Sequence, residues 1–354
     1  MAQRPPDILR ITEAFQRRLR ANEAAAVKRM AQGYERVSRG LVREGVQVAE
    51  EVARLRAAGE AVPTWRIVQL ERYRDLITQA EAELVRLGGE NAEIIAQLQR
   101  EGIELGVGMA QAQVQALIPA SIRISFNLLP TGALEAMAGF LEDGSPLARL
   151  LQDLGVETAR KIGKLLTDGI GLGWNPRKVA KAINRQVGMD LARAMRIART
   201  EQLRAWRQSS IQGYRDQGSL IKGYRRHAQA DDRTCIACLL EDGRLYATEE
   251  DFTDHVQGRC SVIPVTRSWS ELGFPDIKDT NVEWELGEDW FQRQDEDAQR
   301  RILGDPVFDA WRDGKIGLDD MKTLHRSPVW GDAWTANGLK RALEQADIRR
   351  AGGG

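Results

Sequence analysis

Apolar residues recur at helical spacing through the first part of the chain. Residues 7–58 contain no proline, are rich in Ala, Arg, Glu, Leu and Val, and place apolar positions three or four residues apart with charges between them. We expect one very long helix or a helical hairpin over this segment, with Gly33 or Gly40 marking a bend.

Two further amphipathic runs follow, over residues 65–87 and 90–117. Thr64 is a candidate N-cap for the first run, and Gly88-Gly89 predicts a break between the two. Residues 1–130 are therefore expected to form a helical arm, either as a plain helical bundle or as an extended arm that lies on a partner.

Helix-start patterns continue in the middle of the chain. Ser145-Pro146 and Asn175-Pro176 each place a capping residue before a proline at the first helical position. The first pair predicts a helix toward Leu166, and the second a helix that ends near Gly188. A further helix is expected over residues 190–216, and the segment before these helices, 118–130, is interpreted as a joint with a short extended piece at 122–126.

The last part of the chain, residues 269–354, holds six of the nine tryptophans. Helices are expected over 287–303, 306–312 and 318–324, separated by glycines. We interpret this region as a small helical domain with an aromatic core, because each buried aromatic ring removes much apolar area from water. The alternative is that the tryptophans anchor another protein.

Charge is balanced over the whole chain, with 51 basic and 51 acidic residues, so net charge indicates neither a nucleic acid nor a membrane partner. Locally, residues 193–233 hold ten basic against four acidic residues, and residues 270–320 hold six against fifteen. The basic segment is either a set of solvated faces attracted to the acidic one or a surface that contacts DNA or an acidic partner. The candidate DNA-contacting stripe consists of Arg193, Arg196, Arg204, Arg207, Arg225 and Arg226.

The N-terminal residues lack the apolar core of a signal peptide, and no run of about 18 apolar residues exists, so we expect no membrane association. Only three cysteines occur, as expected for synthesis in a reducing cytosol.

All three cysteines lie close together, as Cys235-x-x-Cys238 and Cys260, with His255 between them. Two close pairs of soft ligands suit a tetrahedral zinc ion, so a closed Cys3His site is predicted. A redox pair would be expected in a βαβ unit, which is not apparent here, and unrelated buried thiols are the remaining alternative. Four ligands leave no open position for a substrate water, and the segment 231–268 is too short for a substantial core, so we expect the zinc to be structural.

Several motifs in order carry a resemblance to a known family. Asp168-Gly169-Ile170 and Asn175-Pro176 are followed by Ala198-Arg199-Thr200-Glu201, then by the cysteine pair with Ala230 and Thr234 before it, and by His255, Arg259-Cys260 and Pro264. Over residues 150–268 the chain resembles the phage head morphogenesis family of Mu F-like minor head proteins. The resemblance implies that the helix with Arg199, Thr200 and Glu201 packs beside the zinc module, and we expect these three residues to be structural rather than catalytic.

Two positions depart from the family pattern. Gly258 stands where the family has the first cysteine of a Cys-x-Cys pair, so Cys260 must supply the fourth zinc ligand. His227 occupies a position where the family often has tryptophan, and we expect it to be a surface or hydrogen-bonded residue rather than a ligand.

The predicted fold is mainly α. It comprises the helical arm (1–130), a helical core (131–230), a zinc-stapled module that contains β-structure (231–268) and the Trp-rich acidic helical region (269–354). The resemblance implies a structural protein of a phage or prophage virion, not an enzyme, that associates with portal or capsid proteins and assists head assembly or DNA delivery. Packaged DNA is a further candidate partner, and no small-molecule substrate is expected. The alternative is a zinc-stabilised nuclease or toxin on the same scaffold.

Overall fold

The computed structural model describes residues 6–119, 146–231, 233–279, 284–327 and 332–352. Contacts divide the chain into two compact units. The helical unit comprises residues 20–101 and 139–202, and the mixed unit comprises residues 1–19, 102–138 and 203–354. This division differs from the four sequence ranges given above, which remain a prediction.

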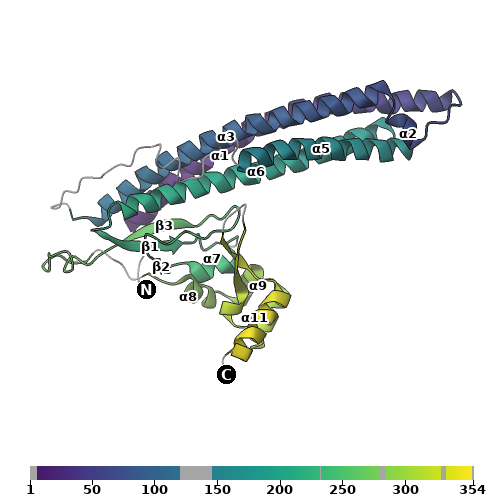
Figure 1. Ribbon diagram of the computed structural model, residues 1–354. Coiled ribbons are helices and arrows are strands. Elements are labelled where there is room, and N and C mark those ends of the chain that lie inside the picture. Colours follow the sequence, from purple (N-terminus) through teal and green to yellow (C-terminus); the bar gives the residue numbers. More distant parts are fainter. Residues whose placement is uncertain (1–5, 120–145, 232, 280–283, 328–331, 353–354) are drawn as a thin grey trace. The chain divides into compact units, whose positions relative to one another are not determined.

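Long helices run alongside one another in the helical unit (Figure 1). They are α1 (Pro6–Ala57), α3 (Glu71–Leu117), α5 (Pro146–Gly171) and α6 (Pro176–Arg215), with the short α2 (Thr64–Ile67) between α1 and α3. Helices α1, α3 and α6 each continue into residues of the mixed unit. No helix among the described residues is both long and apolar enough to cross a membrane.

Glycines allow the helices of this unit to approach closely. A Cβ atom at Gly155 of α5 would lie 2.7 Å from the backbone carbonyl of Leu84 in α3. A Cβ atom at Gly45 of α1 would lie 2.7 Å from Cδ1 of Ile183 in α6. Close packing of this kind accompanies the full burial of apolar residues such as Leu41 and Ile183 in these helices.

Two of the predicted helix breaks do not exist. Helix α3 continues through Gly88-Gly89, and α6 continues through Gly188. A glycine costs only about 1 kcal/mol in a helix, and buried residues on both sides of each glycine, such as Leu87 and Ile95 in α3, outweigh this cost. Helix α1 likewise runs without interruption through Gly33 and Gly40.

The predicted caps have different outcomes. The Oδ1 atom of Asn175 accepts a hydrogen bond from the backbone N–H of Lys178 at 2.9 Å, which confirms this N-cap. Thr64 is the first residue of α2 rather than its cap, because Pro63 occupies the cap position. Ser145 and the extended piece at 122–126 lie outside the described residues.

The mixed unit is built on a three-stranded antiparallel sheet with the strand order β2-β1-β3. Its strands are β1 (Ile221–His227), β2 (Leu245–Tyr246) and β3 (Ser261–Thr266). The core beside this sheet contains Trp206 and Tyr214 from α6, Tyr224 from β1, and Trp269. Residues of α6 therefore pack against the sheet that carries the cysteine region.

The C-terminal residues form a second core with Ile236, Leu239 and Leu240 of α7 (Ile236–Glu241). The elements that follow are α8 (Gly287–Gln292), α9 (Glu296–Leu303), α10 (Asp305–Arg312), a 3-10 turn η1 (Leu318–Met321), β4 (Lys322–His325), β5 (Ala333–Ala336) and α11 (Leu339–Gly352).

Two of the helix predictions in this region were wrong. The helix expected over 287–303 is two helices, because Asp295 caps α9 by accepting a hydrogen bond from the N–H of Ala298. The helix expected over 318–324 is a 3-10 turn followed by β4, which pairs with β5.

The aromatic-core interpretation is confirmed for part of the tryptophans. Trp290 and Trp311 pack against the core around Phe291, and Trp269 is buried in the core beside the three-stranded sheet. Trp330 lies outside the described residues. The mainly helical fold with small antiparallel sheets is the predicted fold class.

Candidate metal centre

Helix α7 positions the first cysteine pair. Cys235 is its N-cap residue, and the N–H of Cys238 donates a hydrogen bond to the carbonyl oxygen of Cys235 at 3.0 Å. The second pair, His255 and Cys260, lies on the segment between β2 and β3, with Cys260 directly before β3. Because β3 pairs with β1, the register of the sheet holds this segment close to α7.

The side chains of Cys235, Cys238 and His255 converge. Their ligand atoms all lie within 4.8 Å of one another. The Nε2 atom of His255 is 3.4 Å from Sγ of Cys235 and 3.2 Å from Sγ of Cys238. Its other ring nitrogen, Nδ1, lies 3.0 Å from the carbonyl oxygen of Val256, which orients the ring. Three of the four residues predicted from the sequence thus form one group that can hold a metal ion.

Cys260 belongs to a second group that shares Cys238 with the first. The ligand atoms of Cys238, Asp254 and Cys260 also lie within 4.8 Å of one another. Cys238 and Cys260 are buried, and the described hydrophobic residues that pack with them are Ala228, Cys235 and Phe252. The two ligand groups therefore adjoin each other, because both contain Cys238.

Asp254 fills the space that Gly258 leaves. A Cβ atom at Gly258 would lie 2.0 Å from Oδ2 of Asp254, so a cysteine at position 258 is incompatible with this carboxylate position. Oδ2 of Asp254 is buried and accepts no hydrogen bond among the described residues. Where the family pattern has a cysteine, this chain therefore brings in a carboxylate oxygen. Sequence reasoning missed Asp254, although its place directly before His255 was a signal.

Two buried arginines surround the same carboxylate. Nη2 of Arg226 lies 2.9 Å from Oδ1 of Asp254, and Nη1 of Arg207 lies 3.1 Å from its Oδ2. Arg226 also points Nη2 at the sulfur atoms of Cys238 (3.4 Å) and Cys260 (3.5 Å). Nη1 of Arg207 donates to the carbonyl oxygens of Gly258 and Cys260. The two guanidinium groups thus contact both the cysteines and the backbone that presents them.

The charges of this cluster fit a divalent cation. If all three cysteines are deprotonated, they and the Asp254 carboxylate carry four negative charges, which two guanidinium groups and one divalent ion would balance. Uncompensated charge is costly in a buried site, so a neutral total favours the bound ion. A metal ion here would draw its ligands from Cys235, Cys238, His255 and either Cys260 or Asp254, and would tie α7 to the segment before β3.

Protonation of the ligands follows from their mutual contacts. The hydrogen bond with Cys238 raises the pKa of His255 to about 9 and lowers the pKa of Cys235. The contact with Cys238, together with burial, raises the pKa of Cys260. These directions describe a cluster in which Cys238 is the shared partner. A bound metal ion would require neutral imidazole and deprotonated sulfur.

A salt bridge outside the cluster joins the two ligand-bearing segments. The guanidinium group of Arg259 donates two hydrogen bonds to the carboxylate of Asp231, at 2.8 and 2.6 Å. The hydroxyl of Thr234 donates to the same carboxylate at 2.8 Å. Arg259 holds the pKa of Asp231 below its usual range. The bidentate pair therefore fixes the segment before Cys235 against the residue before Cys260.

The motif Arg199-Thr200-Glu201 lies on α6 in the helical unit and makes helix-packing contacts. Arg199 forms an ion pair with Glu23 of α1. The Thr200 hydroxyl donates to the carbonyl oxygen of Arg196 at 2.8 Å. Glu201, which is 1% exposed, accepts a hydrogen bond from Gln99 of α3 at 3.0 Å.

The predicted basic stripe needs a correction at two of its six arginines. Arg207 is 5% exposed and Arg226 is 1% exposed, and both serve the cysteine cluster, so they are not part of a surface. Of the others, Arg193 and Arg196 are exposed on α6 in the helical unit, and Arg204 and Arg225 are half-buried in the mixed unit. DNA contact by these four residues remains a prediction.

His227 is not a member of either group of ligands among the described residues. Its ring packs edge-on against Trp284, with 5.6 Å between ring centroids, and its Nδ1 lies 3.7 Å from Oδ1 of Asp242. His227 is thus a partly buried residue that packs against Trp284 beside the Asp242 carboxylate.

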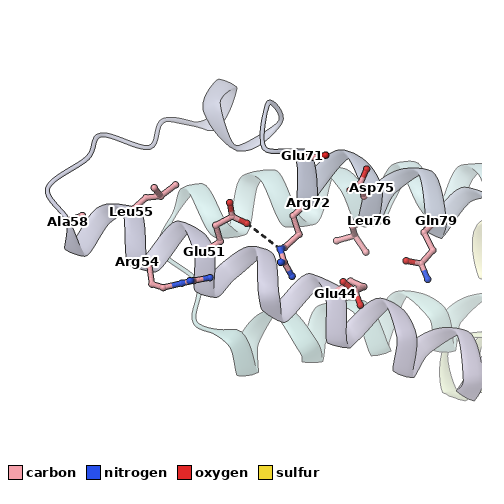
Figure 2. A pocket seen from close by; sticks show the side chains of 10 residues that line it. All are labelled: Glu44, Glu51, Arg54, Leu55, Ala58, Glu71, Arg72, Asp75, Leu76 and Gln79. Atoms are coloured by element: carbon pink, nitrogen blue, oxygen red, sulfur yellow. Dashed lines mark ion pairs between the residues drawn. The ribbon is translucent and has the colours of Figure 1, made fainter.

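A groove of about 730 Å³ lies in the helical unit, between α1 and α3 (Figure 2). Arg72 of α3 reaches across it to Glu51 of α1, at 3.4 Å. Its wall contains neither histidine nor cysteine, and none of the predicted site residues contributes to it. The lining residues are Glu44, Glu51, Arg54, Leu55, Ala58, Glu71, Arg72, Asp75, Leu76 and Gln79.

Comparison with known proteins gives one finding. The model of the family described as Phage Mu protein F like protein matches residues 160–263. The matched segment runs from within α5 through α6 into β3, and it includes Cys235, Cys238, His255 and Cys260, the four predicted ligands. Neither the curated proteins nor the solved structures gave a significant match. Residues 160–263 of this chain are therefore Phage Mu protein F-like, as the sequence resemblance indicated.

Proposed function

We propose that this chain is a minor head protein of a tailed phage or prophage, which associates with the portal or the inner capsid and assists head assembly or DNA delivery. The observation that carries the proposal is the family match over residues 160–263, which coincides with the helix, the sheet and the cysteine cluster described above. The remaining residues would then supply contacts to the virion. The chain would be made in the host cytoplasm and end in the phage head.

In this proposal the metal is zinc and its role is structural. Sulfur and imidazole ligands favour zinc, and Cys235, Cys238, His255 and Cys260 would hold it. The cluster that they form contains few apolar residues, so a bound ion would supply the cross-link that burial does not. We propose no catalytic role, because the surrounding groups are arginines that balance charge rather than a base facing a substrate pocket.

The test is whether the chain enters phage heads. Heads purified from infected or induced cells should contain the chain, and an affinity-tagged chain should retain the portal protein or the capsid protein in a pull-down. Heads that assemble with normal composition and lack the chain would overturn the proposal. DNA contact is tested separately. Retention on duplex DNA at about 50 mM salt that is lost at moderate salt would support it, and no retention at about 50 mM would exclude it.

An assay of plasmid nicking with Mg²⁺ tests the alternative of a nuclease. A ββα-metal nuclease needs a histidine base in addition to metal ligands, and His227 and His325 are the histidines outside the cluster. We expect no cleavage. Cleavage that is lost on substitution of His227 or His325 by alanine would replace the structural proposal with an enzymatic one.

A further inference from the structure

One end of the helical unit exposes apolar side chains that its core does not use. At this end α2, which follows α1 in the chain, contacts α5 (Figure 1). Trp65 is 62% exposed, Val68 39% and Leu172 80%. Ile67, by contrast, is fully buried, so α2 is anchored through one face and turns Trp65 outward. We call Trp65, Val68 and Leu172 the apolar tip.

Arg56 ties together the two segments that form the apolar tip. Its guanidinium group donates to the carbonyl oxygens of Ile170 (3.0 Å) and Gly171 (3.1 Å) at the end of α5. The same group donates to the carbonyl oxygen of Val62, just before α2, at 3.3 Å. The half-buried Arg56 thus joins the residues just before α2 to the end of α5, next to Leu172.

Leu172 is held in a defined helix ending. The N–H of Trp174 donates to the carbonyl oxygen of Gly169 at 2.8 Å, and the N–H of Gly173 donates to that of Ile170 at 3.0 Å. Gly173 has φ +82°, which completes a Schellman motif with Leu172 at the C-cap. This motif needs glycine after the cap but no apolar side chain at the cap itself. The exposure of Leu172 therefore has no explanation in the local fold.

The two segments that form the apolar tip carry more basic than acidic residues. Residues 54–70 contain three basic residues and one acidic residue, and residues 164–181 contain four and one. Among these, Arg54, Arg177, Lys178 and Lys181 are exposed. Apolar side chains within a charged rim are the usual anatomy of a protein interface, in which Trp is a frequent anchor.

We propose that the apolar tip is the surface through which this chain docks onto an acidic head protein. The partner would offer an apolar pocket for Trp65 and Leu172, with carboxylates placed against the basic rim. Leu172 and Val68 can neither stack on bases nor hydrogen-bond to them, which favours a protein over DNA. The same tip of a second copy carries the same positive charge, which disfavours symmetric pairing. The inference rests on the proposed function, because it assigns a surface to the head contact.

Incorporation into heads tests this surface. We would express the head genes with the wild-type chain, with the double substitution Trp65→Ser and Leu172→Ser, or with the control Met189→Ser, and count copies per purified head by quantitative mass spectrometry. Met189 is also exposed, at 47%, and lies on α6 of the same unit. We expect the control to match the wild type and the double variant to fall by at least about tenfold. Incorporation of the double variant at the wild-type level would overturn the docking surface.

A second variant separates loss of docking from loss of folding. The double substitution Arg177→Glu and Lys181→Glu keeps the apolar tip and reverses charge only at its rim, and it should lower incorporation by a similar factor with an unchanged circular dichroism spectrum. Normal incorporation of this variant would contradict the acidic partner. If the wild type itself is absent from heads, the proposed function fails instead, and that result is distinct from a failure of the tip alone.

Two further assays test whether the apolar tip binds a second copy of the chain or DNA instead. Sedimentation and DNA retention of the purified chain, each at about 50 mM salt, show whether the Trp65→Ser and Leu172→Ser variant loses self-association or DNA binding. Either loss, combined with wild-type incorporation into heads, would assign the tip to a second copy or to DNA and overturn the proposal. No change in either assay, combined with lost incorporation, is the result that we expect.

Discussion

The helical unit and the cysteine cluster of the mixed unit reach order by different means. The helical unit has long helices whose buried positions, such as Met30, Leu41, Ile95 and Ile162, repeat over many turns. Among the described residues, the buried hydrophobic members of the cysteine cluster are Ala228, Cys238 and Cys260, and its other buried contacts join Arg207, Arg226 and Asp254. Burial of apolar area stabilises the helical unit, whereas the stability of the cysteine cluster depends on a few polar contacts, each with a large contribution.

Removal of the metal should therefore have the largest effect in these experiments, and it should destabilise the cysteine cluster but not the helical unit. Treatment of purified protein with a zinc chelator should raise amide hydrogen exchange over residues 221–266, while the helical unit keeps its protection. Addition of zinc should restore protection in the wild type but not in a Cys238→Ser variant, because Cys238 belongs to both ligand groups. Unchanged exchange over 221–266 after verified loss of metal would show that the cluster folds without an ion.

A matched pair of substitutions identifies the fourth ligand. Cys260→Ser and Asp254→Asn are nearly isosteric changes in the second ligand group. If Cys260 binds the ion, its loss should lower zinc affinity by more than about 100-fold, whereas loss of an outer residue costs about 10- to 100-fold. Competition with a chromogenic chelator measures both. A larger loss for Asp254→Asn than for Cys260→Ser would make the carboxylate the ligand.

Arg226 tests the dependence of the cluster on buried charge. Arg226→Met removes the cation that pairs with Asp254 and contacts two cysteines, and it should reduce the free energy of unfolding by about 3–5 kcal/mol. Lys222→Met is the control, since Lys222 lies on the same strand and is exposed. Denaturant melts of the zinc-loaded proteins compare the two. An equally small loss of unfolding free energy in both variants would show that Arg226 does not stabilise the cysteine cluster.

In the helical unit, the effect of a substitution on stability should depend on how closely the helices pack at that position. Gly155→Ala forces a methyl group against the backbone of α3 at Leu84, which should cost about 1–3 kcal/mol. Gly89→Ala places the same methyl group in open space on α3, and it should stabilise the helix by up to about 1 kcal/mol. Thermal melts followed by circular dichroism should move in opposite directions. Shifts of the same sign would contradict the close approach of α5 to α3.

The smallest effect should come from Asp190, a carboxyl group that the helical unit buries. Burial raises the pKa of Asp190, and its carboxylate accepts a hydrogen bond from Thr158. Because the pKa is higher in the folded state, the stability contributed by this group is present below the unfolded pKa of about 3.9 and is lost as pH rises through the folded pKa. Asp190→Asn should flatten the pH dependence of the melting temperature above about pH 4. Asp153→Asn, at an exposed position, should not.

The sequence predicted the residues of the cysteine cluster better than the ends of the helices in the helical unit. Spacing alone identified Cys235, Cys238 and His255, because metal ligands must converge whatever the surrounding fold. It placed breaks at Gly88-Gly89 and Gly188 that do not exist, since packing between helices decides whether a glycine ends a helix.

Burial was the property that the sequence predicted least well. Arg226 appeared to belong to an exposed stripe, yet it is 1% exposed and pairs with Asp254. Nothing in the local sequence distinguishes an arginine that faces solvent from one that balances a buried carboxylate. That distinction depends on β1 being the central strand and on the segment before β3 folding over it.

X-ray absorption spectroscopy of the zinc-loaded chain tests the metal centre most directly. We expect one zinc ion per chain, with three sulfur ligands at about 2.3 Å and one nitrogen ligand at about 2.0–2.1 Å. Cys260→Ser should remove one sulfur from this shell. A wild-type spectrum with two sulfurs, one nitrogen and one oxygen would assign the fourth position to a carboxylate or water, and a folded protein that binds no zinc would contradict the metal centre altogether.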